Sequence, residues 1–334
     1  LSGATPALPN YPLQSPDTQI AATELAITAC LEWLSTETSL RTKLAMHLVG
    51  LLTDANLTIL QRSAFGDLLG KFGDPRPGVG VKAGLPDLAW SEPIQPGVFL
   101  MGEQEDWAGR SRFICDLIGQ PYRISRYPIT VAQYQTFVAA GGYDVMRYWT
   151  EAGWTWRTTN QITGAEIYAS AFQTLNHPQV GVSWYEAVAF CAWLSDQTGQ
   201  AIRLPTEPEW ERAARHTDGR LYPWGNAEDP DQHCNMSTTG IRSTSAVGLF
   251  PSGDAFCNAA DMAGNIWEWC NSQWLADYTD YAQKVSNNLA GDRPRVLRGG
   301  SFIDRLFIQC AGRFRINPYE RVNDVGFRVL STSS

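Results

Sequence analysis

Two runs of alternating apolar residues near the C-terminus, each carrying arginine and glycine, bracket a segment that fits no secondary-structure period. The first run, RVLRGGSF, covers residues 295–302, and the second, GFRVL, covers residues 326–330. Runs of this kind are typical of buried strands. The segment between them, residues 303–324, mixes large apolar side chains with Arg, Asn and Asp, which is more typical of a binding surface on a fixed frame than of a core. The sequence therefore predicts a ligand-binding face in this segment.

The composition limits the class of protein. The chain has 334 residues, of which 44% are hydrophobic, enough for one large domain and a smaller one. A formal net charge of −8 disfavours general binding to nucleic acid or anionic membranes. The seven cysteines form no CxxC pair, which argues against a zinc ribbon and against a secreted disulfide framework. Without a signal peptide or an apolar run of about 18 residues, we expect a cytoplasmic protein, and an upstream secretory signal stays open.

Periodicity divides the chain into four parts. Residues 1–18 are rich in Pro, Ser and Thr and predict a loose segment, and residues 19–72 carry helical apolar faces that predict a small helical unit. Residues 73–92 are dense in Gly and Pro, which predicts a linker. The rest, residues 93–334, predicts short strands and long loops with a few helices, two of which begin at the capping-box patterns Ser183 with Glu186 and Thr206 with Glu209.

A series of motifs within residues 93–334 carries a family resemblance. They are PGVFLMG (96–102), YPITVAQYQTFV (127–138), HPQVGVSWYEAVAFCAWLS (177–195), IRLPTEPEWERAAR (202–215), YPWGN (222–226), DMAGNIWEWC (261–270), RVLRGGSF (295–302) and GFRV (326–329). In this order they resemble the formylglycine-generating enzyme (sulfatase-modifying factor) family. The resemblance implies an α+β fold of the C-type-lectin-like kind, with a small antiparallel sheet and much irregular loop. The predicted linker resembles those that join such domains to larger multidomain proteins.

The residues that would carry the family's oxidase chemistry are missing. The enzyme resembled here binds copper with two cysteines placed shortly after the RGGS strand, because thiolates suit Cu(I). In this chain Asp304 stands about where the first of them would be, and Cys310 resembles a structural cysteine of the family. Iron-dependent sulfoxide synthases of the same fold use a histidine cluster, whereas the four histidines here have no ligand spacing. We therefore expect no copper and no enzyme activity, and keep a copper or iron oxidase of this family as the alternative.

The segment at residues 295–330 resembles the variable region of proteins that diversity-generating retroelements rewrite on this same fold. That resemblance implies a non-catalytic protein that binds an unidentified protein or other macromolecule, with Phe307, Phe314 and Tyr319 as the main anchors. An ordinary inactive member of the enzyme family is the open alternative. The residues expected to contact the ligand are Ile303, Asp304, Arg305, Leu306, Phe307, Ile308, Phe314, Ile316, Asn317, Tyr319, Val322 and Asn323.

The resemblance also implies calcium sites, since loops that supply only oxygen ligands suit Ca²⁺. The first site would use the carboxylates and backbone carbonyls of Asp261, Gly264, Ile266 and Glu268. The second would use Asn235, Met236 and Ile241, with Thr239 where a carboxylate is expected. The competing interpretation pairs Asp261 and Glu268 with arginines. Finally, the resemblance implies that Cys191 and Cys310 lie close together.

Overall fold

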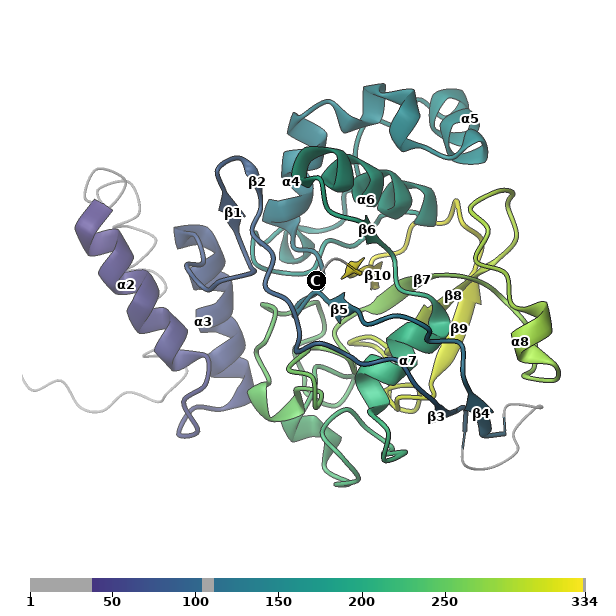
Figure 1. The fold of residues 1–334 in the computed structure, drawn as a ribbon. Helices are drawn as coiled ribbons and strands as arrows, with labels where there is room; N and C mark the ends of the chain where they lie inside the picture. The colour runs from purple at the N-terminus through teal and green to yellow at the C-terminus, as the bar shows by residue number, and fades with distance from the viewer. Residues whose placement is uncertain (1–37, 104–110, 333–334) are drawn as a thin grey trace, which may run out of the picture.

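The computed structural model describes residues 38–103 and 111–332 (Figure 1). The helices are α2 (Thr38–Leu51), α3 (Ile59–Phe72), α4 (Val131–Ala139), α5 (Glu151–Thr159), α6 (Trp184–Thr198), α7 (Glu207–Arg215) and α8 (Tyr281–Lys284). The strands are β1 (Val81–Lys82), β2 (Leu85–Pro86), β3 (Phe99–Met101), β4 (Phe113–Cys115), β5 (Arg123–Ile124), β6 (Ile202–Arg203), β7 (Trp267–Gln273), β8 (Arg295–Arg298), β9 (Arg313–Ile316), β10 (Val325–Gly326) and β11 (Leu330–Ser331). Long loops connect these short strands, as the sequence predicted.

Local capping explains where the two central helices begin. The side chain of Ser183 accepts a hydrogen bond from the backbone of Glu186, whose carboxylate accepts from the Ser183 N–H at 2.7 Å. Thr206 and Glu209 make the same reciprocal pair at the start of α7. Each pair satisfies backbone donors that a helix start leaves free, and both predicted capping boxes are therefore confirmed.

The C-terminal segment builds two sheets. One has the strand order β10-β7-β8-β9, in which β10 runs parallel to β7 and the other pairs are antiparallel. The other is the three-stranded sheet β5-β11-β6. Strand β9 lies inside the segment that we predicted to be irregular, and it forms because residues 313–316 pair with all four residues of β8.

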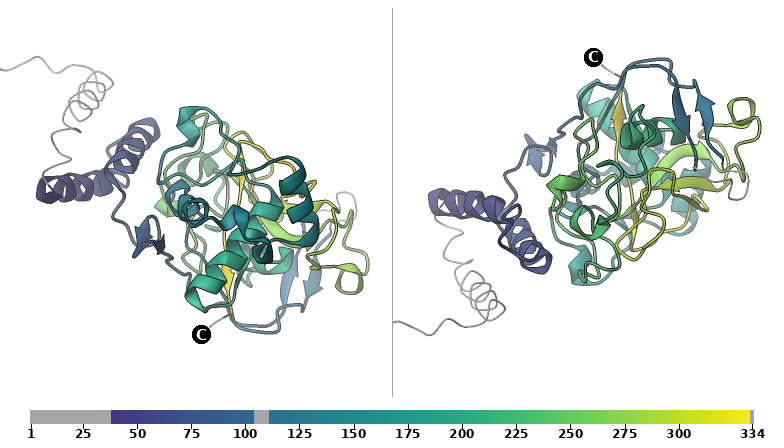
Figure 2. Two further views of the ribbon diagram at one scale, coloured as in Figure 1. Left: turned by 90° about the horizontal axis from the view of Figure 1, so that it is seen from above. Right: turned by 90° about the horizontal axis from the view of Figure 1, so that it is seen from below.

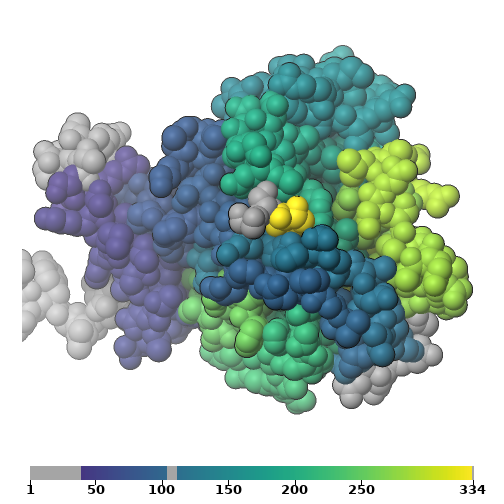
Figure 3. Space-filling model, viewed as in Figure 1, coloured from purple at the N-terminus to yellow at the C-terminus, as the bar shows by residue number. Residues whose placement is uncertain are grey.

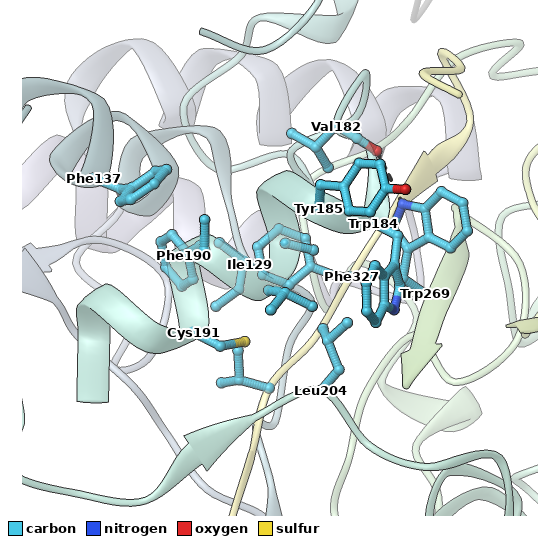
Figure 4. Close-up of a cluster of buried hydrophobic side chains, with 14 of the residues drawn as sticks. Ile129, Phe137, Val182, Trp184, Tyr185, Phe190, Cys191, Leu204, Trp269 and Phe327 are labelled. Carbon is cyan, nitrogen blue, oxygen red and sulfur yellow. Dashed lines mark hydrogen bonds between the residues drawn. The ribbon is translucent and has the colours of Figure 1, made fainter. Parts of the chain in front are cut away.

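The main core cluster surrounds α6 (Figure 4). Trp184, Phe190 and Trp269 are buried there beside Phe327, which lies between β10 and β11. The indole of Trp269 donates to the carbonyl of Val182 at 2.9 Å, so the buried polar atom of this side chain is satisfied. These contacts hold the C-terminal strands against α6.

The expected proximity of Cys191 and Cys310 is wrong. Cys191 packs in the cluster around α6, whereas Cys310 packs in a second cluster that contains Trp210. Both thiols are free and buried. Each acts as a small apolar residue in its own cluster.

Buried ion pairs fix the strands β8 and β9 to α7. Arg298 bonds to Glu211, and Arg313 Nε lies 2.7 Å from an oxygen of Glu207. All four side chains are inaccessible to solvent. Because removing one partner would leave a buried charge uncompensated, these pairs hold the loop that follows β8 in a defined position.

The helical hairpin of α2 and α3 lies along one side of the molecule (Figures 1 and 2). Its apolar contacts include Leu68 and Leu69 on α3, which pack in one cluster with Leu249 and Phe250. Residues 73–92, predicted as a linker, contain the β1–β2 hairpin, and the amide of Gln133 on α4 donates to the carbonyls of Gly78 and Asp87. In the space-filling view the end of the described chain emerges in the middle of one face (Figure 3). Among the residues described, no helix combines the length and apolarity that a membrane span needs.

Candidate functional site

The loop that follows β8 begins with two glycines that allow a close approach of backbone segments. Gly299 and Gly300 both have positive φ angles, 99° and 70°. A Cβ atom at Gly300 would lie 3.1 Å from the backbone of Phe307 and from the side chain of Ile308. Glycine is the residue that tolerates this conformation without strain. The two glycines therefore form a turn that ends β8 and places Ser301 just beyond the strand.

Ser301 joins two carboxyl groups that come from opposite ends of the segment. Its Oγ lies 2.8 Å from Oδ2 of Asp304 and 2.9 Å from Oδ2 of Asp324. The backbone N–H of Ser301 also donates to Oδ2 of Asp304, at 2.9 Å. Asp324 directly precedes β10, so the strand order β10-β7-β8 places it beside the end of β8.

The two carboxyl groups differ in their surroundings. Asp324 is 5% exposed, whereas Asp304 is partly open to solvent. Burial raises the pKa of Asp324; the hydrogen-bond contact with Ser301 opposes this shift, and the nearby charge of Asp304 adds to it. No Arg, Lys or His in residues 38–103 or 111–332 forms an ion pair with either group. Within the described residues, the arrangement is therefore a pair of acids without an ion-pair partner.

Apolar side chains flank Asp304 along the loop and on β9. Ile303 is 61% exposed, and Leu306 is 76% exposed. Phe307 and Phe314 both pack on Trp267, with ring centroids 6.1 and 5.9 Å from the indole. We call Ile303, Leu306, Phe307 and Phe314 the apolar wall. An apolar surface beside uncompensated acids can hold the apolar part of a small molecule while its polar group meets a carboxyl.

The other residues predicted to contact a ligand do not form one surface with the apolar wall. Ile308 is a correction: it is 1% exposed and packs with Cys234, Met236 and Ala263, because its side chain lies beneath the glycine turn. Tyr319 is exposed but lines a different groove. Of the remaining predicted residues, Arg305 is exposed, and those that are partly exposed are Asp304, Ile316, Asn317, Val322 and Asn323.

The groove beside Tyr319 has a volume of about 950 Å³ and lies between α5, α6 and residues 288–292. Trp156 and Tyr185 contribute aromatic side chains, with ring centroids 5.9 Å apart. The hydroxyl of Tyr185 donates to the carbonyl of Gly291 at 3.3 Å, which ties α6 to the loop that borders the groove. Glu151 and Asp292 add carboxylates to the lining. The groove is a concave surface formed by other residues than those around Ser301.

The first predicted calcium site does not fit a calcium ion. Arg328 donates to both carboxylate oxygens of Glu268, at 2.6 and 2.7 Å, and Trp210 donates to one of them at 2.7 Å. Arg328 also donates to the backbone carbonyls of Ala260 and Asp261. A guanidinium group therefore neutralises the carboxylate that a cation would need. The competing interpretation, an ion pair with arginine, holds for Glu268.

The other predicted calcium ligands are likewise engaged with protein atoms. The carboxylate of Asp261 accepts from the N–H of Gly248 at 2.7 Å, and the carbonyl of Gly264 accepts from the N–H of Ile266. At the second site, the hydroxyl of Thr239 lies within hydrogen-bond distance of both the Asn235 side chain and the carbonyl of Met236. Ile241 packs against the cluster of α2 and α3. A hydroxyl donor thus occupies the place where a carboxylate would complete the site.

The described residues do not fit copper or iron either. Cys310 has no solvent exposure, and burial raises the pKa of its thiol to about 12, so the thiolate that Cu(I) needs is disfavoured. His177 contacts Asp67 and Thr244, and His233 contacts Asp229, which leaves them apart from each other. In the part of the chain that the structure describes, no three His, Cys, Asp or Glu side chains converge as metal ligands.

Ser301 and Asp324 were not among the residues predicted to form a site. Their only signal in the sequence is their position: Ser301 lies near the end of the first framework run, and Asp324 lies two residues before the second. Asp304 was predicted as a ligand contact and identified as the residue in place of a cysteine. The structure brings these three residues together.

Comparisons with known proteins place the fold. Residues 91–333 match the family described as the sulfatase-modifying factor enzyme 1-like domain. The structure of PvdO from Pseudomonas aeruginosa is 25% identical, with a TM-score of 0.59 over 77% of this chain and 98% of that one. The expected C-type-lectin-like α+β fold of this family is confirmed. Variable protein 1 of Treponema denticola shares the fold, with a TM-score of 0.55 over 73% of this chain and 95% of that one, but is only 20% identical.

Two curated relatives carry the names of enzymes. The hercynine oxygenase of Mycobacterium tuberculosis is 32% identical over 227 residues, which cover 62% of this chain and 52% of that protein. The formylglycine-generating enzyme of Thermomonospora curvata is 34% identical over 263 residues, which cover 63% of this chain and 81% of that protein. The chain therefore spans about half the length of the hercynine oxygenases it matches.

Proposed function

Because the chain belongs to the sulfatase-modifying factor enzyme 1-like domain family, we propose that it is an oxidoreductase whose reacting site is the loop after β8. The observation that carries this proposal is its identity of about one third with relatives named hercynine oxygenase and formylglycine-generating enzyme. The site would consist of Ser301, Asp304 and Asp324, bordered by the apolar wall. Its substrate would be an organic molecule with an ionisable group beside an apolar part.

This proposal corrects our expectation of a non-catalytic protein diversified by a retroelement. That expectation rested on the exposed apolar residues of the segment at 303–324 and on the missing cysteine pair. Several curated relatives are named hercynine oxygenase or formylglycine-generating enzyme, which points to an oxidase and overturns that expectation. The likeness to the Treponema variable protein is 20% in sequence and concerns the fold alone. The alternative that we kept, an oxidase of this family, is better supported.

The proposal assigns no metal to the described residues. The thiol of Cys310 is buried, and the position of the family's first copper ligand is occupied by Asp304. Among residues 38–103 and 111–332, no group of three or more His, Cys, Asp or Glu side chains is placed to hold a copper or iron ion. No step is therefore assigned to a metal, and the roles proposed below belong to side chains that are present.

Those roles follow from burial and hydrogen bonding. Asp304 is the acid that a bound substrate can reach, because it is partly exposed at the edge of the apolar wall. Ser301 orients its carboxyl group through both the backbone N–H and the side-chain hydroxyl. Ile303 and Leu306 are exposed apolar side chains that would cover the apolar part of the substrate and exclude water from the carboxyl group.

The experiment that tests the function is oxygen consumption by the full chain. The purified protein would be incubated with hercynine and, separately, with a cysteine-bearing peptide, in the presence of Fe(II), of Cu(I) and of neither. An oxygen electrode and mass spectrometry of the substrate give two independent readouts. We expect substrate-dependent oxygen uptake that falls at least tenfold in Asp304→Asn. Asp116→Asn is the matched control, since Asp116 is exposed and lies elsewhere.

The outcome that overturns the proposal is equally specific. If the folded protein consumes no oxygen above the buffer rate with either substrate under any of the three metal conditions, the assignment fails. It also fails if Asp304→Asn and Asp116→Asn behave alike, because the reaction would then not use this loop.

A further inference from the structure

We infer that Asp324, Ser301 and Asp304 share one proton and form a relay from a buried carboxyl group to the surface, at the position where the family's copper cysteine would stand. The inference concerns the protonation of these three residues. Only its role in turnover rests on the proposed function. The step is pure proton transfer, and no electrons move in it.

The contacts of Ser301 with the two carboxyl groups need more protons than the Ser301 hydroxyl carries. Ser301 Oγ is within 2.9 Å of one oxygen from each carboxyl group, which is hydrogen-bond distance in both cases. A hydroxyl has one hydrogen to donate, and an ionised carboxylate can only accept. If both aspartates were ionised, one of the two contacts would hold two oxygens together without a proton. One additional proton, on a carboxyl group, satisfies both contacts.

The surroundings of the two carboxyl groups favour Asp324 as the one that carries the additional proton. The backbone N–H of Ser301 donates to Asp304, which favours the ionised form of this partly exposed group. Asp324 is 5% exposed, and burial disfavours its charged form. The relay is therefore Asp324 O–H to Ser301 Oγ, and Ser301 O–H to Asp304 Oδ2.

Among the described residues, Asp324 differs from the buried glutamates in having no ion-pair partner. The other fully buried acids of the described chain, Glu186, Glu207, Glu211 and Glu268, each have an arginine partner. Asp324 has none among residues 38–103 and 111–332. A buried acid without a cation keeps its proton more readily than one in an ion pair. The protonated form of Asp324 is thus the form that this environment stabilises.

The neighbouring titratable groups agree with this assignment. Tyr168 is close enough to Asp324 for the two to affect each other, and its hydroxyl donates to the carbonyl of Arg321 at 3.1 Å. Burial is the main reason that the pKa of Tyr168 is raised, so this side chain stays neutral and adds no charge. The guanidinium of Arg321 is itself bonded to Glu186 and lies 3.3 Å from Glu166. The charge that helps to raise the pKa of Asp324 is that of Asp304.

The relay gives the site two proton-transfer directions. Asp304 can accept a proton from a substrate O–H, N–H or S–H group, which raises the trio from one shared proton to two. In the reverse direction the proton of Asp324 moves onto Ser301 while the proton of Ser301 moves through Asp304 to a substrate anion, which leaves both carboxyl groups ionised. Because Asp324 is only 5% exposed, its proton reaches the surface through Ser301 and Asp304.

The test reads the protonation state directly. Protein with isotopically labelled aspartate carboxyl carbons would be titrated by infrared and carbon NMR spectroscopy in wild type and in Asp324→Asn. We expect the wild type to retain a protonated aspartate at pH 7 and the variant to lose this signal. Ser301→Ala keeps both acids but removes the bridge, and we expect it to shift the titration of the pair. Asp116→Asn is the control with unchanged spectra.

One further variant keeps the result unambiguous. Burial raises the pKa of Asp261 to about 6, so Asp261→Asn separates the signal of that carboxyl group from that of Asp324. Asp324→Asn preserves the shape of the side chain and offers an amide N–H to Ser301, which favours retention of the fold. A wild type without any protonated aspartate at pH 7, or a signal that persists in Asp324→Asn, would overturn the relay. A protonated Asp324 in a protein that oxidises no substrate would support the relay while rejecting the proposed function.

Discussion

The guanidinium of Arg328 donates to both oxygens of the Glu268 carboxylate, with Nε 2.6 Å from Oε2 and Nη2 2.7 Å from Oε1. Both side chains are essentially inaccessible to solvent. This ion pair joins residues 326–330 to β7. It also neutralises the carboxylate of Glu268, which we predicted to bind calcium. Its energetics can be tested separately from any enzyme activity.

Glu268→Gln is expected to lower the free energy of unfolding by about 3–5 kcal/mol, because it leaves Arg328 buried without a counter-charge. Urea denaturation followed by tryptophan fluorescence measures this change. Asp218→Asn is the matched control, since Asp218 pairs with Arg220 at the surface, and it should cost less than about 1 kcal/mol. Equal effects of the two substitutions would contradict the buried pair.

Calcium is expected to leave the thermal stability unchanged. A ligand that binds only the native state stabilises it by RT ln(1 + L/Kd), where L is the free ligand concentration, so the melting temperature rises once that concentration exceeds Kd. The oxygens of Glu268 are already bonded to Arg328 and Trp210. Differential scanning fluorimetry with millimolar Ca²⁺ and with EDTA should therefore give the same midpoint, and a saturable upward shift with Ca²⁺ would show that a site exists.

Asp304→Cys is expected to restore no tight Cu(I) binding. The substitution supplies one thiol at the family's position, but the nearest thiol along the chain, Cys310, is buried with a pKa raised to about 12 by that burial. A competition titration against a chromogenic Cu(I) chelator measures the affinity. Stoichiometric copper binding that outcompetes the chelator would show that Cys310 can reach the site.

Ile308→Ala is expected to destabilise the protein by about 2–5 kcal/mol, as buried large-to-small changes do. Leu306→Ala, two residues earlier but 76% exposed, should change stability by no more than about 0.5 kcal/mol. Chemical denaturation of the two variants compares a framework residue with an apolar-wall residue. Similar costs at both positions would mean that the loop packs differently.

The stability of the wild type is expected to fall relative to Asp324→Asn as the pH rises above about 4. Burial raises the pKa of Asp324 above its value in the unfolded chain, so the native state binds more protons between the two pKa values. Stability then decreases with rising pH across that interval and levels off above the native pKa. Urea denaturation between pH 4 and pH 8 checks the sign, and a wild-type stability that rose relative to the variant would reverse it.

Sequence reasoning predicted the elements that depend on local chemistry. The capping boxes at Ser183 and Thr206 define the starts of α6 and α7, since each involves residues only three positions apart. Strand β9 was missed because Arg313 and Arg315 alternate with apolar residues. This pattern does not show which face of the strand is buried and which is exposed. Arg313 is buried, and its charge is balanced by Glu207, a residue of α7.

The site was predicted only in part for a similar reason. Asp304 could be identified from its position after the RGGS motif, but Asp324 reaches Ser301 only because β7 lies between β8 and β10. No local pattern encodes that adjacency. The exposed residues of the apolar wall were read as a diversified binding face, and exposure alone cannot separate a substrate wall from a protein-binding surface.

The most direct test of the account is oxygen consumption by the full chain with hercynine or a cysteine-bearing peptide, measured for wild type and Asp304→Asn. The account predicts substrate-dependent uptake in the wild type, with an oxidised product in the mass spectrum, and at least a tenfold loss in the variant. A folded wild type that takes up no oxygen with either substrate, with or without added iron or copper, would contradict it.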